Sequence, residues 1–219
     1  YNGYFYTPRG NSQLNLYKYD VVNDSWASVT SAPTGVTFND DHNLTMKGDN
    51  IYINRGGATN VFYRYDISED KWYELTNTPT TNRYVGLVYN SGDDTIYFFR
   101  GDNTQEIWKY DPDSNTFDSL AYLLTNYGTG ADLVHYGGYL YGPRGTSTNF
   151  YRYSISGNSW EARTSAGGNI QYDCKGVAAG DYLYFFQGNT TAFYRYDPSG
   201  NGWDTMTATL GTATNGCAL

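Results

Sequence analysis

The sequence predicts an all-β fold, a β-propeller of five four-stranded antiparallel blades. First, a triplet of aromatic, basic and aromatic residues recurs five times at intervals of 43 to 46 residues. Its second aromatic residue is Tyr19, Tyr65, Tyr110, Tyr153 and Tyr196. Second, a large aromatic side chain follows each of these seven residues later, at Trp26, Trp72, Phe117, Trp160 and Trp203. Third, the 22 acidic residues are mostly Asp, and Asp favours turns where Glu favours helices. A repeat of this length suits one propeller blade.

Each repeat has the pattern of four short strands, which we call a, b, c and d. Strand a carries small residues, strand b is an apolar run, strand c is the aromatic triplet, and strand d begins near the large aromatic residue. In strand c the two-residue period places both aromatic side chains on one face and the basic one on the other. Turn signals such as Gly92-Asp93 separate a from b, and an Asp or Asn lies in every c–d turn.

The two ends of the chain predict how the ring closes. Residues 216–219 resemble strand a, and residues 1–4 resemble the turn and strand b that follow it. We therefore expect residues 1–219 to form a single domain in which the C-terminal strand joins the N-terminal blade, hiding both edges. Because the chain opens on Tyr1 inside a predicted strand, we interpret it as a processed product or an excised domain.

The repeat resembles the kelch family of the galactose-oxidase type. The shared features are the glycine after strand b, the tyrosine in strand c and the tryptophan seven residues later, and they cover the whole chain. One departure is that the kelch Gly-Gly pair survives only at Gly56-Gly57. The resemblance implies a propeller whose b–c and d–a loops form the binding face.

Composition excludes several classes of partner. A net charge of −8 disfavours nucleic acid, and no apolar run approaches the ~20 residues of a membrane span, so we expect no membrane insertion. Few Lys and many Tyr, Thr and Asn are typical of secreted or cell-surface proteins. No metal, cofactor or nucleophile motif occurs, so we predict no cofactor, no metal and no catalytic residue. Cys174 and Cys217 occupy the same strand-a position, either as a disulfide or as two buried thiols.

The loop face holds the candidate ligand-binding residues. The residue that directly follows the strand-b run occupies the same repeat position in every blade. From blade one to blade five it is Arg9, Arg55, Arg100, Arg144 and Gln187. Guanidinium groups there suit an anion, although a repeated arginine can instead bind a neighbouring backbone carbonyl. The longer d–a loops add His42, Tyr84, Tyr127 and Tyr172. The basic residues of strand c are expected between blades or on the surface, and the aspartates at the opposite end are expected to form turns.

We predict non-catalytic, extracellular recognition of a glycan or protein ligand on the loop face. One alternative is a structural domain of a surface appendage or virion, where the propeller contacts copies of itself; a large exposed aromatic patch away from the loops would favour it. The other is a polysaccharide-acting enzyme, which needs two facing carboxylates. Its candidate carboxylates are Asp40, Asp41, Asp132 and Asp173.

Overall fold

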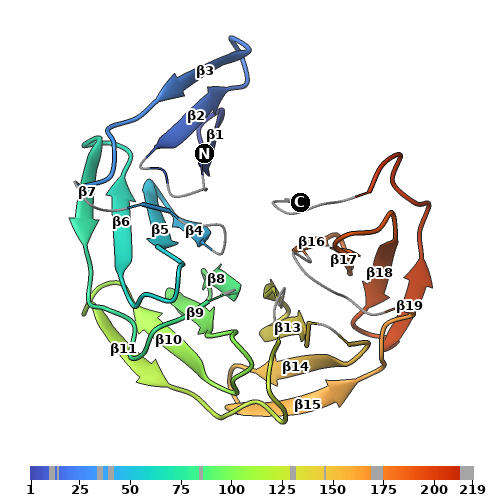
Figure 1. Cartoon of the computed structure of the whole chain (residues 1–219). Helices are drawn as coiled ribbons and strands as arrows, with labels where there is room; N and C mark the ends of the chain where they lie inside the picture. The colour runs from blue at the N-terminus through green and yellow to red at the C-terminus, as the bar shows by residue number, and fades with distance from the viewer. Residues whose placement is uncertain are drawn as a thin grey trace. The chain divides into compact units, whose positions relative to one another are not determined.

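The computed structural model describes residues 1–9, 13, 15–33, 37–38, 42–83, 86–128, 132–145, 147–168 and 175–212. Across these ranges the secondary structure is entirely β, arranged as five antiparallel sheets (Figure 1). None of the described residues forms a helix long and apolar enough to cross a membrane. The predicted fold class, a five-bladed β-propeller, is therefore confirmed.

The chain divides into two compact units, Tyr1–Arg83 and Tyr84–Leu219, and each is described by itself. The first unit holds blade one, formed by β1 (Tyr4–Pro8), β2 (Leu16–Asp20) and β3 (Ser25–Ser28). It also holds blade two, formed by β4 (Asn43–Lys47), β5 (Asn50–Asn54), β6 (Phe62–Asp66) and β7 (Lys71–Glu74).

The second unit holds the other three blades. Blade three consists of β8 (Gly86–Asn90), β9 (Thr95–Phe99), β10 (Ile107–Asp111) and β11 (Thr116–Ser119). Blade four consists of β12 (Val134–Tyr136), β13 (Tyr139–Pro143), β14 (Phe150–Ser154) and β15 (Ser159–Arg163). Blade five consists of β16 (Lys175–Ala179), β17 (Tyr182–Phe186), β18 (Phe193–Asp197) and β19 (Gly202–Thr205).

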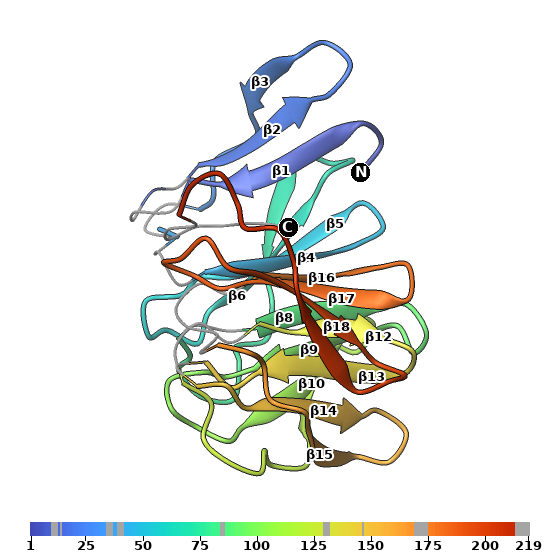
Figure 2. The same ribbon diagram turned by 90° about the vertical axis from the view of Figure 1, so that its right-hand side faces the viewer.

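Neighbouring strands within each blade are consecutive in sequence, as predicted for strands a to d. Figure 2 labels all four strands of blade four, β12 to β15. Blade one shows three strands among the described residues, b to d, because residues 216–219, expected to supply its strand a, lie outside the described ranges. The register explains the seven-residue spacing, since Tyr153 of strand c lies directly opposite Trp160 of strand d. Their ring centroids are 5.1 Å apart.

The c–d turn between these two aromatic residues has the same geometry in every blade. Its Asp or Asn adopts a left-handed conformation, with φ between 44° and 55°, at Asp24, Asp70, Asn115, Asn158 and Asn201. The strand-c tyrosine hydroxyl donates to the side chain of that residue, for example from Tyr153 to Asn158 Oδ1 at 2.8 Å. Short side-chain amides and carboxylates tolerate this backbone conformation, so the local sequence determines the turn.

The same turn residue joins one blade to the next, in an arrangement we call the inter-blade clamp. Asn158 Oδ1 of blade four accepts the backbone N–H of Ala121, which follows strand d of blade three, at 2.9 Å. In return, Trp160 Nε1 donates to the Ala121 carbonyl at 2.9 Å. Asn201 and Trp203 hold Thr164 in the same way, and Asp70 and Trp72 hold Thr30. In blade three the position of the tryptophan is taken by Phe117, which has no indole N–H and cannot donate the hydrogen bond that Trp160 donates.

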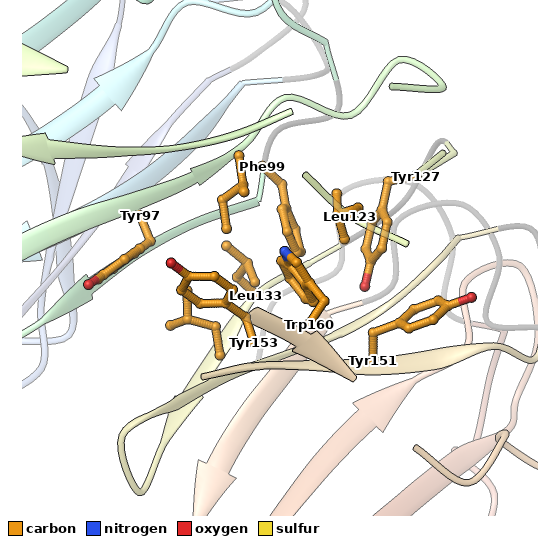
Figure 3. Close-up of a cluster of buried hydrophobic side chains, with 10 residues drawn as sticks. Tyr97, Phe99, Leu123, Tyr127, Leu133, Tyr151, Tyr153 and Trp160 are labelled. Atoms are coloured by element: carbon orange, nitrogen blue, oxygen red, sulfur yellow. The ribbon is translucent and has the colours of Figure 1, made fainter. Parts of the chain in front are cut away.

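Apolar packing fills the space between clamped blades. Figure 3 shows the largest cluster, in which Phe99 of blade three stacks on Trp160 of blade four with ring centroids 5.3 Å apart. Phe150 and Phe185 play the corresponding part between blades four and five. Inter-blade burial therefore accounts for the high aromatic content.

Blade one differs from the others on one face. Phe5 and Trp26 are 67% and 62% exposed, whereas Leu140 and Trp160 at the equivalent positions of blade four are 0% and 8% exposed. The described residues of the first unit leave this apolar face of blade one uncovered.

Removing the indole N–H of a clamp should weaken the junction it spans. We expect Trp160→Phe to lower the free energy of unfolding by about 1–3 kcal/mol, because a hydrogen bond is lost and a smaller ring leaves a void. Urea denaturation measures the change. The control is Tyr122→Phe, on a side chain that is 65% exposed, for which we expect a change within about 0.5 kcal/mol. Equal stabilities for the two variants would contradict the role of the clamp.

Asp70 should make the first unit's clamp sensitive to acid. The Tyr65 hydroxyl, then the backbone N–H and hydroxyl of Thr30, hold the pKa of Asp70 below its ordinary value of 3.8. A carboxyl whose folded pKa is depressed stabilises the fold above its unfolded pKa, and this stability is lost as pH falls through the folded pKa. Between about pH 5 and pH 3, we therefore expect Asp70→Asn to lose less stability than the wild type. Parallel losses in urea titrations at each pH would refute this expectation.

Candidate functional site

The b–c and d–a loops, which form the loop face, are braced by repeated backbone hydrogen bonds. The N–H of Asn82 donates to the Thr59 carbonyl at 3.0 Å, and the N–H of Tyr127 donates to the Thr104 carbonyl at 2.7 Å. A second brace joins the residues after strand d to the b–c loop, as in Leu123 N–H to the Gln105 carbonyl at 3.0 Å. These bonds fix the positions of the described loop backbone from which the side chains project.

Two of the arginines predicted for this face are anchored in the same way. Arg55 Nε donates to the Thr37 carbonyl at 3.1 Å, and Arg144 Nε donates to the Asn126 carbonyl at 2.9 Å. In each case the acceptor lies 18 residues earlier, in the d–a loop that leads into the same blade. The terminal guanidinium nitrogens of both arginines have no hydrogen-bond partner among the described residues. Each arginine therefore offers an oriented pair of N–H donor groups.

The other positions of the predicted ring have different environments. Arg100 Nη1 forms an ion pair with Glu106, which neutralises its charge locally. Gln187 Oε1 accepts the Tyr194 hydroxyl at 3.1 Å. The Arg9 side chain is exposed. The five repeated positions thus do not form one uniform set of anion-binding groups.

The aromatic and histidine candidates of the d–a loops also differ from one another in their surroundings. Tyr127 is fully buried, its hydroxyl donates to the Gly142 carbonyl at 2.6 Å, and burial raises its pKa (Figure 3). It therefore belongs to the core cluster between blades three and four and not to a ligand-contacting surface. The His42 ring lies 6.2 Å from the Phe38 ring. Tyr84 and Tyr172 lie outside the described residues, as do both cysteines.

Asp132 is the one carboxylate of the four enzyme candidates that lies within the described residues. It is 7% exposed, and its Oδ2 accepts the Gly176 N–H at 3.0 Å. Lys175 Nζ lies 3.8 Å from the other oxygen. Asp132 therefore links the start of strand a in blade five to the segment before strand a in blade four.

Aspartates at the opposite ends of the strands form turns, as expected. Asp197 Oδ1 accepts the backbone N–H groups of Ser199 and Gly200 at 2.8 and 3.0 Å, and these bonds lower its pKa. Asp66 and Asp111 bind their own turns in the same manner. Within the described ranges, no group of three or more His, Cys, Asp or Glu side chains is placed to hold a metal ion.

The strand-c basic residues pair within their own blades. Arg152 forms an ion pair with Glu161, directly across from it on strand d. Arg195 and Asp204 form the corresponding pair in blade five at 2.8 Å. These groups lie on the sheet surface, which is one of the two locations expected for them from the sequence; the other was the space between blades.

One pair of exposed loop residues is not among the candidates predicted from the sequence. Tyr122 and Leu124 follow strand d of blade three and are 65% and 57% exposed. The signal was present in the repeat alignment, because the position of Tyr122 holds Ser31, Asn77, Ser165 or Ala208 in the other blades. A large aromatic residue at an otherwise small or polar position is not required by the scaffold.

The placement of Tyr127 can be tested through stability. We expect Tyr127→Phe to lower the free energy of unfolding by about 1–3 kcal/mol, because the buried Gly142 carbonyl loses its hydrogen-bond donor. Thermal or urea denaturation measures the loss. Unchanged stability would show that the hydroxyl is not needed in the core.

Comparisons with known proteins support the fold. No family model matches the sequence, and no curated protein matches it. Among solved structures, the structure of YjhT is similar, with a TM-score of 0.76 at 13% identity over 97% of this chain and 83% of that one. In all, 786 chains of solved structures match, so the fold alone does not specify a function. The comparisons and the sheet topology together identify the chain as a β-propeller.

Proposed function

We propose that the protein is a kelch-like, non-catalytic recognition module that acts outside the cell and binds an acidic glycan on its loop face. The observation that carries this proposal is the matched anchoring of Arg55 and Arg144 to loop carbonyls. The repeat pattern in the sequence supports the kelch assignment, and the composition supports the extracellular one.

The anchoring determines what these arginines can bind. Since Nε is occupied by a carbonyl, the two terminal nitrogens remain as a planar pair that matches the two oxygens of a carboxylate. Holding the side chain through Nε also reduces the conformational entropy lost on binding. Each arginine is thus suited to a carboxylate on a ligand, as a separate contact.

The surroundings of the arginines favour a glycan. The b–c loops carry Asn, Thr, Ser and Gln side chains, which hydrogen-bond to sugar hydroxyls. The chain as a whole is acidic, with a net charge of −8, so an acidic ligand must be held by local contacts and not by the overall field. Asp132, the one enzyme candidate within the described residues, is engaged by Lys175 and Gly176.

A structural role is the second candidate, and the apolar face of blade one that the described residues of the first unit leave uncovered favours it. Phe5, Trp26 and Val22 are 67%, 62% and 85% exposed, away from the loop face. Apolar patches of this kind are typical of protein contact surfaces. In this alternative the protein associates with copies of itself, and its loops bind no ligand.

A glycan array that carries carboxylated oligosaccharides and their neutral counterparts tests the proposal. We expect the wild type to bind carboxylated glycans and Arg55→Ala/Arg144→Ala to lose at least about tenfold in affinity, since a charge-assisted hydrogen bond contributes about 1.5–3 kcal/mol. The loss should shrink as salt is added.

The matched control is Lys109→Ala/Arg195→Ala, which removes the same charge from two strand-c residues that pair with Asp118 and Asp204 of strand d, and it should leave binding unchanged. Equal losses in both double variants would point to overall charge and refute a specific site. No binding by the wild type, together with self-association that Trp26→Ser abolishes, would favour the structural alternative.

A further inference from the structure

The segment 120–128, which we call the blade-three strap, is held at both of its ends. Near its start, Ala121 lies in the inter-blade clamp with Asn158 and Trp160. Near its end, the Asn126 carbonyl accepts Arg144 Nε, and the Gly128 N–H donates to the Arg144 carbonyl at 2.9 Å. All of these contacts lie within the second unit.

The strap exposes alternate side chains because its backbone is fixed. Leu123 is 4% exposed and its N–H donates to the Gln105 carbonyl, so it points into the core. Its neighbours Tyr122 and Leu124 are therefore directed outward, at 65% and 57% exposure.

Folding does not explain these two residues. In blade four the equivalent strap carries Ser165 and Gly167, and it makes the same clamp and the same brace. The exposed apolar surface of Tyr122 and Leu124 is thus a feature that the scaffold does not use.

We propose that the blade-three strap is the binding track for an acidic oligosaccharide, with a carboxylate on Arg144 and a sugar ring against Tyr122. This inference rests on the proposed function and adds the length of the ligand and its direction. Tyrosine presents a flat apolar face with a polar tip, which suits the apolar face of a sugar ring whose edge carries hydroxyls.

The size of the patch favours a sugar over a protein partner. A stable protein interface takes about 20–30 residues on each side, whereas this patch consists of two exposed side chains. One sugar ring covers a patch of that size.

The length of the strap leaves room for more than one sugar. The Arg144 guanidinium lies beside Asn126, and Tyr122 lies four residues earlier. At about 3.3 Å per extended residue, the two contacts are separated by at most roughly 13 Å. A short oligosaccharide can span a separation up to this limit, and the comparison of monosaccharide with oligomer tests whether the two contacts take separate sugars.

The test compares galacturonic acid with its oligomers, using isothermal titration at low salt. We expect Tyr122→Ala to weaken binding of the oligomer by about tenfold, the size of one lost stacking contact, and to leave binding of the monosaccharide unchanged. Arg144→Ala should weaken both. Ser165→Ala is the control at the equivalent strap position and should bind as the wild type does.

The outcomes separate this inference from the proposed function. If Arg144→Ala loses the oligomer and Tyr122→Ala keeps it, the track is refuted and the arginine site stands. If Tyr122→Ala weakens monosaccharide and oligomer equally, the track is also refuted, because Tyr122 then acts at the arginine contact itself. If the wild type binds neither probe nor any carboxylated oligosaccharide on the array, both ideas are overturned. Because Tyr122 is exposed, its variant should keep the wild-type unfolding midpoint, which a thermal scan verifies.

Discussion

The structure depends on one side-chain oxygen in each c–d turn. That oxygen belongs to a residue in the left-handed conformation, which only a few residue types adopt without strain. It accepts the tyrosine hydroxyl of its own blade and, at the junctions within each unit, a backbone N–H of the preceding blade. The tryptophan of the same blade then binds the carbonyl of that same preceding residue. Turn, strand pairing and blade packing are therefore coupled through a single position.

This coupling has consequences for the loop face. A residue held through both its N–H and its carbonyl, such as Ala121, begins the d–a loops after blades one, three and four from a fixed point. The braces to the b–c loops fix the backbone further along. A rigid backbone allows loop side chains to vary without cost to the scaffold, so departures from the repeat are the places to look for function. Such places are the exposed Tyr122 and Arg144, whose terminal nitrogens have no hydrogen-bond partner among the described residues.

The arginines show how a repeated residue can serve two purposes. From the sequence alone, these arginines could serve either a structural role or a ligand-binding role. The structure gives Arg55 and Arg144 a structural hydrogen bond through Nε and leaves their terminal nitrogens available, so the two roles are compatible. Arg100 occupies the same repeat position, but Glu106 lies six residues later and takes up its charge. A difference in one neighbouring residue thus changes what the position offers.

The repeat by itself determined the fold class, the four-strand pattern and the turn chemistry, because these follow from local periods and from residues such as Asp70 that tolerate the left-handed conformation of the turn. The seven-residue spacing of Tyr153 and Trp160 was visible as a pattern, but its meaning as a cross-strand pair followed once the register was known. Only the tertiary structure decided that Tyr127 is a core residue and that Tyr122 faces solvent. Both tyrosines lie in the same loop, and their exposure depends on contacts with Gly142 and Gln105, which are distant in sequence. Burial and hydrogen-bond partners of loop residues are set by such long-range contacts, which a single sequence does not encode locally.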